Sequence, residues 1–285
     1  IMSSDWSSDV CSSDLDLEKK TKDSQARFFL LSHMRGHIAD MDKVKALCQR
    51  LGVCLVEDCA HTVGCRWGER FTGTFGKVGC FSSQTYKHIN SGEGGLLVTD
   101  DEEVAAKAIL YSGSYMLYEK HLSRPAMEVF EQFKKRIPNF SLRMSNLQAA
   151  LLRPQLKDLD RQCRRWNERY AVLEKALGKL DHFRVPQRPA KEHYVGSSIQ
   201  FTLVGVERQQ VQNFLEECGR RGVEIKWFGW KEPVGFTSSF ESWQYIEELP
   251  QLPRTKQILD FMCDFRIPLT FSIEDCKTLA AIIDQ

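Results

Sequence analysis

Short apolar segments alternate with helical patterns through the first half of this 285-residue chain. Runs of strand length lie at residues 27–33, 53–56, 80–82 and 96–99. Asp40 precedes a helical pattern that continues to about residue 51, and Asp100 precedes another that ends by Gly113. Aspartate is a favoured residue at the start of a helix. Such alternation predicts an α/β fold with a mostly parallel sheet and helices on both faces.

The second half predicts a smaller α+β domain. A helical pattern begins at Ser145 and continues to about residue 177, and Pro154 is expected to kink or restart it. Gly178 and the prolines at 186 and 189 mark a boundary. Beyond it we expect strands at 197–204, 223–227 and 265–269, and helices at 207–221, 254–263 and 273–283. The predicted division is therefore a large domain over residues 16–177 and a small domain over 178–285.

The charge balance and the cysteines exclude several classes of function. Lys and Arg number 39 and Asp and Glu 38, so a net charge of +1 gives no electrostatic reason to expect nucleic acid as a partner. We expect no membrane partner, since no apolar run approaches the roughly 20 residues of a membrane helix. The ten cysteines form no C-x-x-C pair, so no zinc or other metal is predicted. Several of the cysteines lie in apolar segments, where a reduced cysteine acts as a small apolar residue, and this fits a reducing cytoplasm.

The first fifteen residues have an unusual composition. Ser-Ser-Asp occurs three times between residues 3 and 14, and the run from Asp5 to Leu15 looks like a translated sequencing adapter. We interpret residues 1–15 as an artefactual tail and leave them out of the fold prediction. A natural, disordered polar tail is the alternative.

Lys87 carries the strongest functional signal. It follows the apolar segment at 80–82 in a stretch rich in hydroxyl side chains, and a Gly-Glu-Gly-Gly turn at 92–95 separates it from the next apolar segment. Upstream, the segment at 53–56 leads into Asp58. Burial of the Lys87 amine would lower its pKa and make it nucleophilic. Taken alone, Lys87 would be read as a surface lysine in a loop.

Together these residues are the parts needed to hold pyridoxal 5′-phosphate (PLP). A lysine amine can form an imine with the PLP aldehyde, a carboxylate can keep the ring nitrogen protonated, and hydroxyls with turn amides can hold the phosphate. Asp58 could instead cap the turn that follows it. Glu57 is the weaker candidate for the ring nitrogen, because side chains alternate along a strand and Glu57 points the other way.

The chain resembles the DegT/DnrJ/StrS aminotransferases from about residue 27 to residue 285. The similarity is carried by the Lys87 segment and by four further runs: Val56 to Gly64, Gly73 to Gly76, Gly36 to Asp42 and Arg143 to Ala150. The resemblance implies a fold type I PLP enzyme, a homodimer that moves an amino group from glutamate or glutamine to a keto sugar, a cyclitol or a related acceptor. It also implies about a hundred further residues before Arg27, so that the chain holds a partial large domain and is truncated.

The resemblance also assigns roles to single residues. Lys87 becomes the catalytic and PLP-bound lysine, and Asp58 the partner of the ring nitrogen. His61 corresponds to a position beside the ring, and Ser82 to a phosphate-binding serine. Ser141 stands where the family often has an asparagine that reaches the phosphate of the partner subunit. The alternatives are a packed histidine at 61 and a turn serine at 82.

Some features depart from the family and leave alternatives open. The small domain has Lys226 to Trp230 where relatives often have a His-Tyr-Pro substrate motif, and these aromatic rings could stack on a substrate or belong to the core. A PLP-dependent sugar dehydratase is one alternative, although such relatives tend to carry histidine in place of the lysine. A PLP-binding protein without catalysis, or an inactive fragment, is the other.

Overall fold

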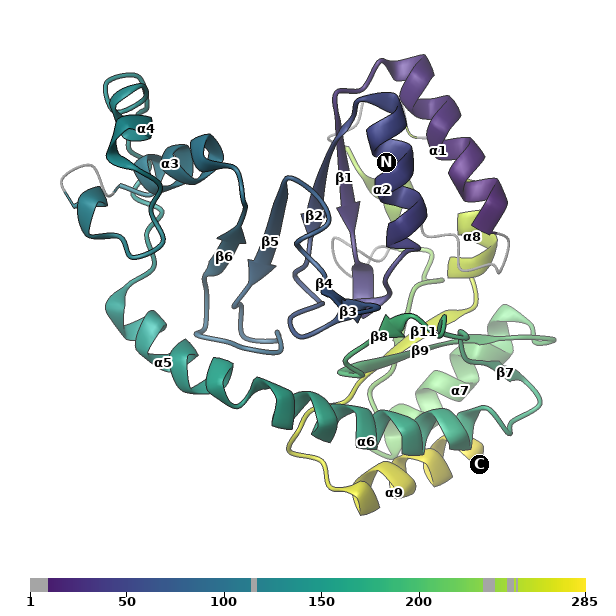
Figure 1. Ribbon diagram of the computed structural model, residues 1–285. Coiled ribbons are helices and arrows are strands. Elements are labelled where there is room, and N and C mark those ends of the chain that lie inside the picture. Colours follow the sequence, from purple (N-terminus) through teal and green to yellow (C-terminus); the bar gives the residue numbers. More distant parts are fainter. Residues whose placement is uncertain (1–9, 114–116, 233–238, 245–248, 250) are drawn as a thin grey trace. The chain divides into compact units, whose positions relative to one another are not determined.

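The computed structural model describes residues 10–113, 117–232, 239–244, 249 and 251–285, with side chains from Leu17 onwards (Figure 1). Contacts divide these residues into two compact units, residues 10–159 with 191–194 and residues 160–190 with 195–285. The domain boundary predicted at residue 177 stays a prediction. Residues 1–9 of the expected tail lie outside the described residues, and residues 10–15 begin helix α1 (Val10–Ser24), where the sequence analysis assigned no element.

The first unit contains a four-stranded sheet in the order β1-β2-β5-β6 (Figure 1). Its strands are β1 (Phe28–Ser32), β2 (Cys54–Asp58), β5 (Val78–Ser82) and β6 (Gly95–Val98). The pairings β1–β2 and β2–β5 are parallel, and β6 is antiparallel to β5. The predicted α/β class is confirmed, since the sheet is parallel in two of its three pairings and helix α2 (Met41–Leu51) connects β1 to β2.

Helix α2 (Met41–Leu51) shows how local sequence sets an element. The side chain of Asp40 accepts a hydrogen bond from the Lys43 N–H at 3.1 Å, and Gly52 ends the helix with φ +65°. This left-handed conformation suits glycine, which has no Cβ to clash. One apolar face of the helix is buried, and it is made of Met41, Val44, Leu47 and Cys48.

The remaining helices of the first unit differ from the prediction in detail. Helix α3 (Glu102–Tyr111) is capped by Asp101, whose side chain accepts from the Val104 N–H at 2.9 Å, and not by Asp100. The region 113–140, to which no element was assigned from the sequence, contains helix α4 (Met127–Glu131), whose Phe130 is fully buried against α3. Helix α5 (Asn146–Lys157) is capped by Ser145 as predicted and continues past Pro154 to a break at Asp158. A small sheet joins β3 (Arg66–Trp67), β4 (Arg70–Phe71) and β8 (Glu192–His193).

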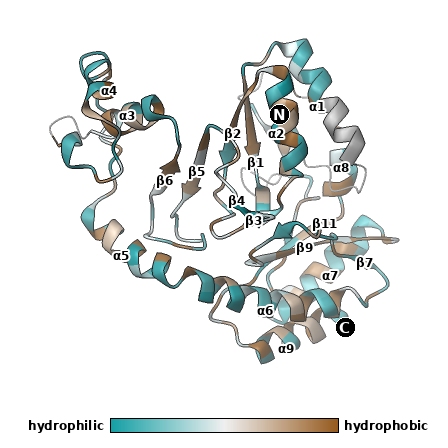
Figure 2. Cartoon of the chain, in the orientation of Figure 1, coloured by the Kyte–Doolittle hydropathy of each residue, from teal (hydrophilic) through white to brown (hydrophobic). Residues whose placement is uncertain are grey.

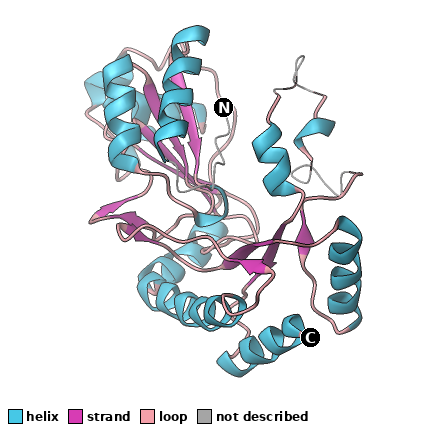
Figure 3. Ribbon diagram, turned by 90° about the vertical axis from the view of Figure 1, so that its right-hand side faces the viewer, coloured by secondary structure: helices cyan, strands magenta, loops and turns pink. Residues whose placement is uncertain are grey.

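The second unit is built on an antiparallel sheet in the order β10-β11-β9-β7, with strands in magenta in Figure 3. The strands are β7 (Phe183–Arg184), β9 (Ser198–Leu203), β10 (Lys226–Trp227) and β11 (Met262–Arg266), and the helices are α6 (Leu159–Leu177), α7 (Arg208–Arg220), α8 (Pro253–Leu259) and α9 (Ile273–Asp284). Helix α6 is tied to the segment after β11, because Trp166 donates from Nε1 to the Ile267 carbonyl at 3.0 Å. The predicted α+β character is confirmed.

Two strands of the second unit fall elsewhere than predicted. Strand β11 lies at Met262–Arg266 and not at 265–269, since it pairs residue by residue with β9 and Pro268 cannot extend a ladder. The predicted helix 254–263 accordingly ends at Leu259. The strand predicted at 223–227 is limited to Lys226–Trp227. Trp227 takes the core role, with 1% of its surface exposed and its Nε1–H donated to the Asp260 carbonyl.

Strands β1 and β6 are apolar yet open to solvent within this chain (Figure 2). The apolar run at 27–33 is typical of a buried strand, but β1 is buried on one face only. Only Phe29 and Leu31 are buried, whereas Phe28 is 66% and Leu30 59% exposed. All four residues of β6 are exposed. The first sheet therefore presents an apolar surface that this single chain does not cover.

Candidate active site

Polar side chains gather at the carboxyl ends of the parallel strands. Ser32 ends β1, Asp58 ends β2 and Ser82 ends β5, and the ladder places Ser32 opposite Asp58. The ends of parallel strands meet at one edge of a sheet, which is where ligands bind in open α/β folds. Asp58 and Ser82, two of the residues predicted for the site, therefore belong to one edge.

Asp58 is oriented by two hydrogen bonds. Its Oδ2 accepts from Ser32 Oγ at 2.7 Å, and its Oδ1 accepts from the Ala60 N–H at 3.0 Å. The half-buried carboxylate therefore caps the turn after β2, which was the alternative role considered for Asp58. Capping leaves the carboxylate at the strand end, so it does not exclude a role toward a ring nitrogen, which stays a prediction.

Lys87 and His61 meet through their side chains. The Lys87 Nζ lies 3.0 Å from His61 Nε2, although the two residues come from loops after different strands. Burial, followed by the charges of Lys87, Arg35 and His88, lowers the pKa of His61 to about 3, while Asp58 acts in the opposite direction. His61 is therefore neutral at pH 7, and its Nε2 can accept a hydrogen bond from the Lys87 ammonium. The charges of Lys87 and Asp58 both act on His61, so the three side chains lie near one another.

The segment around Lys87 is closed by backbone hydrogen bonds. The N–H of Ser83 donates to the Gly94 carbonyl, and that of Thr85 donates to the Gly92 carbonyl, both at 2.9 Å. Gly94 has φ +136°, and a Cβ on it would lie 2.7 Å from Ser83 Oγ. Close packing thus favours glycine at position 94, independently of any ligand.

The two predicted phosphate serines are placed differently. Ser82 is half-buried at the end of β5, and its Oγ accepts from the Gln84 N–H at 3.2 Å. Ser141 is exposed, has φ +52° and donates its N–H to Asn139 Oδ1. The N–H of its neighbour Phe140 donates to the carbonyl of Tyr111, the last residue of α3. The structure brings Ser82 to the site edge and leaves Ser141 beside α3, and their roles toward a phosphate stay predictions.

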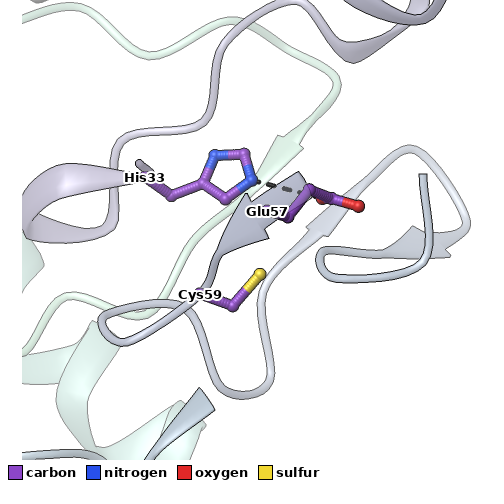
Figure 4. A group of neighbouring side chains, drawn as sticks. All are labelled: His33, Glu57 and Cys59. Atoms are coloured by element: carbon purple, nitrogen blue, oxygen red, sulfur yellow. Dashed lines mark hydrogen bonds and ion pairs between the residues drawn. The ribbon is translucent and has the colours of Figure 1, made fainter. Parts of the chain in front are cut away.

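Glu57, His33 and Cys59 form a buried cluster behind Asp58 (Figure 4). Glu57 accepts backbone N–H groups from Gly73, Phe75 and Gly76 at 2.7 to 2.8 Å, and His33 Nε2 lies 3.3 Å from its Oε2. Burial raises the pKa of the Cys59 thiol to about 12. Because backbone amides of the 73–76 loop donate to the Glu57 carboxylate, the cluster holds that loop against β2.

Two residues at the site were missed by the sequence analysis. Arg35 follows β1 with φ +57° and contributes positive charge at His61. His88 is buried beside Lys87, and its Nδ1 lies 2.9 Å from the Val63 carbonyl oxygen. The order of the parallel strands could have indicated Arg35, because its turn follows the strand next to Asp58. Nothing in the local sequence marks His88.

Comparison with known proteins identifies the family. The family model described as the DegT/DnrJ/EryC1/StrS aminotransferase family matches residues 7–283. The chain belongs to this family.

Relatives within the DegT family act on sugars and cyclitols by name. The chain is 36% identical over 149 residues to an L-glutamine:2-deoxy-scyllo-inosose aminotransferase of Micromonospora echinospora, covering 52% of this chain and 35% of that protein. It is 26% identical over 202 residues to a GDP-perosamine synthase of Escherichia coli O157:H7, covering 71% and 52%. The chain therefore spans about a third to a half of the length of these curated relatives.

Solved structures show the same fold. The aminotransferase TlmJ of Streptoalloteichus hindustanus matches with a TM-score of 0.74 at 20% identity, over 90% of this chain and 65% of that one. The E. coli GDP-4-keto-6-deoxy-D-mannose-3-dehydratase with bound hydrated PLP matches with a TM-score of 0.74 at 19% identity, over 95% and 70%. The predicted fold type I architecture of PLP-dependent enzymes is confirmed. Among the described residues, no helix is long and apolar enough to span a membrane.

Proposed function

We propose that this protein is a PLP-dependent aminotransferase that moves an amino group from glutamate or glutamine to the keto group of a sugar, a cyclitol or a related acceptor. The observation that carries the proposal is the contact of 3.0 Å between Lys87 Nζ and His61 Nε2. It lies at the sheet edge where β2 ends in Asp58. Membership of the DegT family and the named substrates of its relatives support it.

The residues present fit PLP by their chemistry. PLP supplies an aldehyde that a lysine amine can join with loss of water, and a ring that takes up electrons when a C–H bond of the bound amine breaks. Lys87 offers the amine and is half-buried. Asp58 would face the ring nitrogen, His61 would lie beside the ring, Ser82 would bind the phosphate and Ser141 would reach the phosphate of a partner subunit.

The chain's own groups would act by orientation and proton transfer. Ser32 and the Ala60 N–H hold Asp58 in one position, so its charge needs no rearrangement to meet a protonated ring nitrogen. The neutral His61 accepts from the Lys87 ammonium and holds that amine at the strand edge. With its amine free, Lys87 could move a proton from the α-carbon of the amino donor to the C4′ carbon of PLP.

The exposed apolar surface of the first unit supports a homodimer as part of this proposal. Besides strands β1 and β6, apolar side chains of the segment before α5 and of α5 itself are open to solvent: Phe140 at 58%, Leu142 at 71%, Leu147 at 73% and Leu151 at 50%. A second copy could cover them, and large uncovered apolar patches are typical of interfaces. The free cysteines of the described side chains are compatible with the cytoplasmic location that we also propose.

A PLP-dependent sugar dehydratase is a second candidate, because one solved structure of similar fold has that name. The presence of Lys87 favours the aminotransferase. A PLP-binding protein without turnover is the third candidate, since the chain spans 35% to 52% of the relatives compared.

One experiment separates the aminotransferase from a PLP-binding protein without turnover. The chain is mixed with PLP, and the visible spectrum is recorded before and after addition of glutamine or glutamate. We expect a band of bound PLP that the donor bleaches, with formation of pyridoxamine phosphate measured by chromatography. A band that the donor leaves unchanged supports binding without turnover, and the absence of any band in the folded chain contradicts the proposal. Lys87→Ala is the control.

A further inference from the structure

His88 couples two loops that carry the site. The lysine loop, residues 83–91, follows β5, and the His61 loop, residues 59–65, follows β2. The contact between Lys87 Nζ and His61 Nε2 is made at the tip of a long lysine side chain. A contact of this kind persists only if the backbones of both loops are held at a fixed separation, because the lysine side chain alone has many rotamers.

The His88 side chain supplies such a link. It is 8% exposed, and its Nδ1 lies 2.9 Å from the carbonyl oxygen of Val63 in the His61 loop. A carbonyl can only accept, so Nδ1 must carry the proton and donate it. Burial lowers the pKa of His88 to about 4, against the opposing effect of the Val63 hydrogen bond. The ring is therefore neutral at pH 7 and held in the tautomer that makes this bond.

The residues after His88 anchor the same side of the lysine loop. Ile89 is 1% exposed and packs in a cluster with Val63 and Leu152. Gln155 of α5 binds the backbone of Asn90 in both directions, accepting from its N–H at 2.9 Å and donating to its carbonyl at 2.7 Å. His88 thus stands between the reactive side chain and a fixed anchor, and its own bond reaches the loop of His61.

We propose that His88 is a positioning residue for Lys87, whose Nδ1–H bond to the Val63 carbonyl holds the lysine loop against the His61 loop. The role of His88 in catalysis rests on the proposed function, because a displaced Lys87 amine would react with PLP less readily. Its physical content concerns this chain alone, since it predicts the environment of the Lys87 amine without any cofactor.

Three substitutions of His88 isolate the hydrogen bond. Asparagine carries its amide nitrogen on Cγ, as histidine carries Nδ1, so His88→Asn can keep the donor to Val63. Glutamine carries its nitrogen one carbon further out, so His88→Gln keeps a polar amide and loses the geometry. His88→Leu removes the donor. His182 provides a matched control in the second unit, because it is exposed and its Nδ1 lies 3.0 Å from the Val204 carbonyl oxygen. His182→Leu removes a comparable bond elsewhere.

Two readouts are measured on each full-length variant. The first is the rate at which acetic anhydride acetylates Lys87 relative to the exposed Lys179, by peptide mass spectrometry in the absence of PLP. The second is the PLP concentration that gives half-maximal labelling of Lys87 after borohydride reduction. Loss of one buried hydrogen bond is worth about 1 kcal/mol, which corresponds to roughly a fivefold to tenfold change. We expect changes of this size in both readouts for His88→Leu and His88→Gln, and values within about twofold of wild type for His88→Asn and His182→Leu.

The outcomes discriminate clearly. Wild-type values for His88→Leu and His88→Gln would overturn the proposal, as would a His88→Asn variant impaired as strongly as His88→Gln. If His88→Leu does not give a cooperative melt, the Asn and Gln pair decides the question. If wild type and His182→Leu acquire no PLP label at Lys87, the proposed function fails, and the acetylation rates still decide the role of His88.

Discussion

The two four-stranded sheets of this protein differ in how far their side chains are buried within the chain. In the second unit, strands β9 and β11 are buried along almost their whole length, and their central polar pair is satisfied internally, because Gln200 donates to Asp264 Oδ1 at 2.6 Å. In the first unit, β1 and β6 leave apolar side chains open, while the strand ends carry the polar residues of the site. The second sheet therefore satisfies its own apolar and polar groups, whereas the first sheet leaves apolar side chains open to solvent.

The largest expected effect is a difference in core packing between the sheets. Phe201 in β9 is 0% exposed and Phe28 in β1 is 66% exposed. Phe201→Ala should lower the free energy of unfolding by roughly 3–5 kcal/mol through lost burial and a cavity, and Phe28→Ala by about 0.5 kcal/mol or less. Denaturant melts of the two variants measure this. Equal losses would show that β1 is covered in solution, which would itself locate an interface.

The next effect concerns the buried carboxylate of the first sheet. Glu57→Gln replaces an acceptor oxygen by an amide that faces a backbone N–H of the 73–76 loop. We expect a loss of about 3 kcal/mol, since hydrogen bonds to a charged group are strong and the freed donors stay buried. The exposed Glu224 gives the control, and Glu224→Gln should melt like wild type. A Glu57→Gln variant as stable as the control would contradict the structural role assigned to the cluster.

Because of the Glu57 carboxylate, we expect the stability of the first sheet to depend on pH. Burial raises the pKa of Glu57, but hydrogen bonds from His33 and from the Gly76 and Gly73 amides outweigh it, so the pKa lies below the ordinary 4.5. The unfolded chain then binds the proton more readily, so this stability is present above about pH 4.5 and is lost as pH falls through the folded-state pKa. Hydrogen exchange should show protection of residues 54–58 falling with acid in wild type and changing less in Glu57→Gln. Equal slopes would contradict this.

A smaller effect, on the pKa of His61, tests how far the site is shielded from solvent. His61 should remain neutral at pH 5, because burial and neighbouring positive charge lower its pKa to about 3. Lys87→Ala removes one positive neighbour and should raise the pKa of His61, while burial, the larger cause, keeps it below 6.5. Nitrogen NMR of the imidazole across pH 3 to 7 measures both proteins. Titration of wild-type His61 near 6.5 would show an open edge.

The sequence predicted those elements whose signals are local. Asp40 with the apolar face of α2, the strand that ends in Asp58, and the glycine turn after Lys87 are each specified by neighbouring residues. Strand β11 was misplaced because its apolar run satisfies both helix and strand patterns, and only pairing with β9 fixes its register. His88 was missed because its partner Val63 lies 25 residues away. Exposure of β1 was missed because the apolar run of a strand does not record what covers it.

The central claim is that the Lys87 amine binds PLP covalently at the carboxyl edge of the first sheet. Incubation of the folded chain with PLP, borohydride reduction and peptide mass spectrometry test it most directly. The account predicts that the label falls on Lys87 well below the PLP concentrations that mark exposed lysines, and that Lys87→Ala loses this label alone. Labelling spread evenly over the exposed lysines, or its concentration on another residue, would contradict the account.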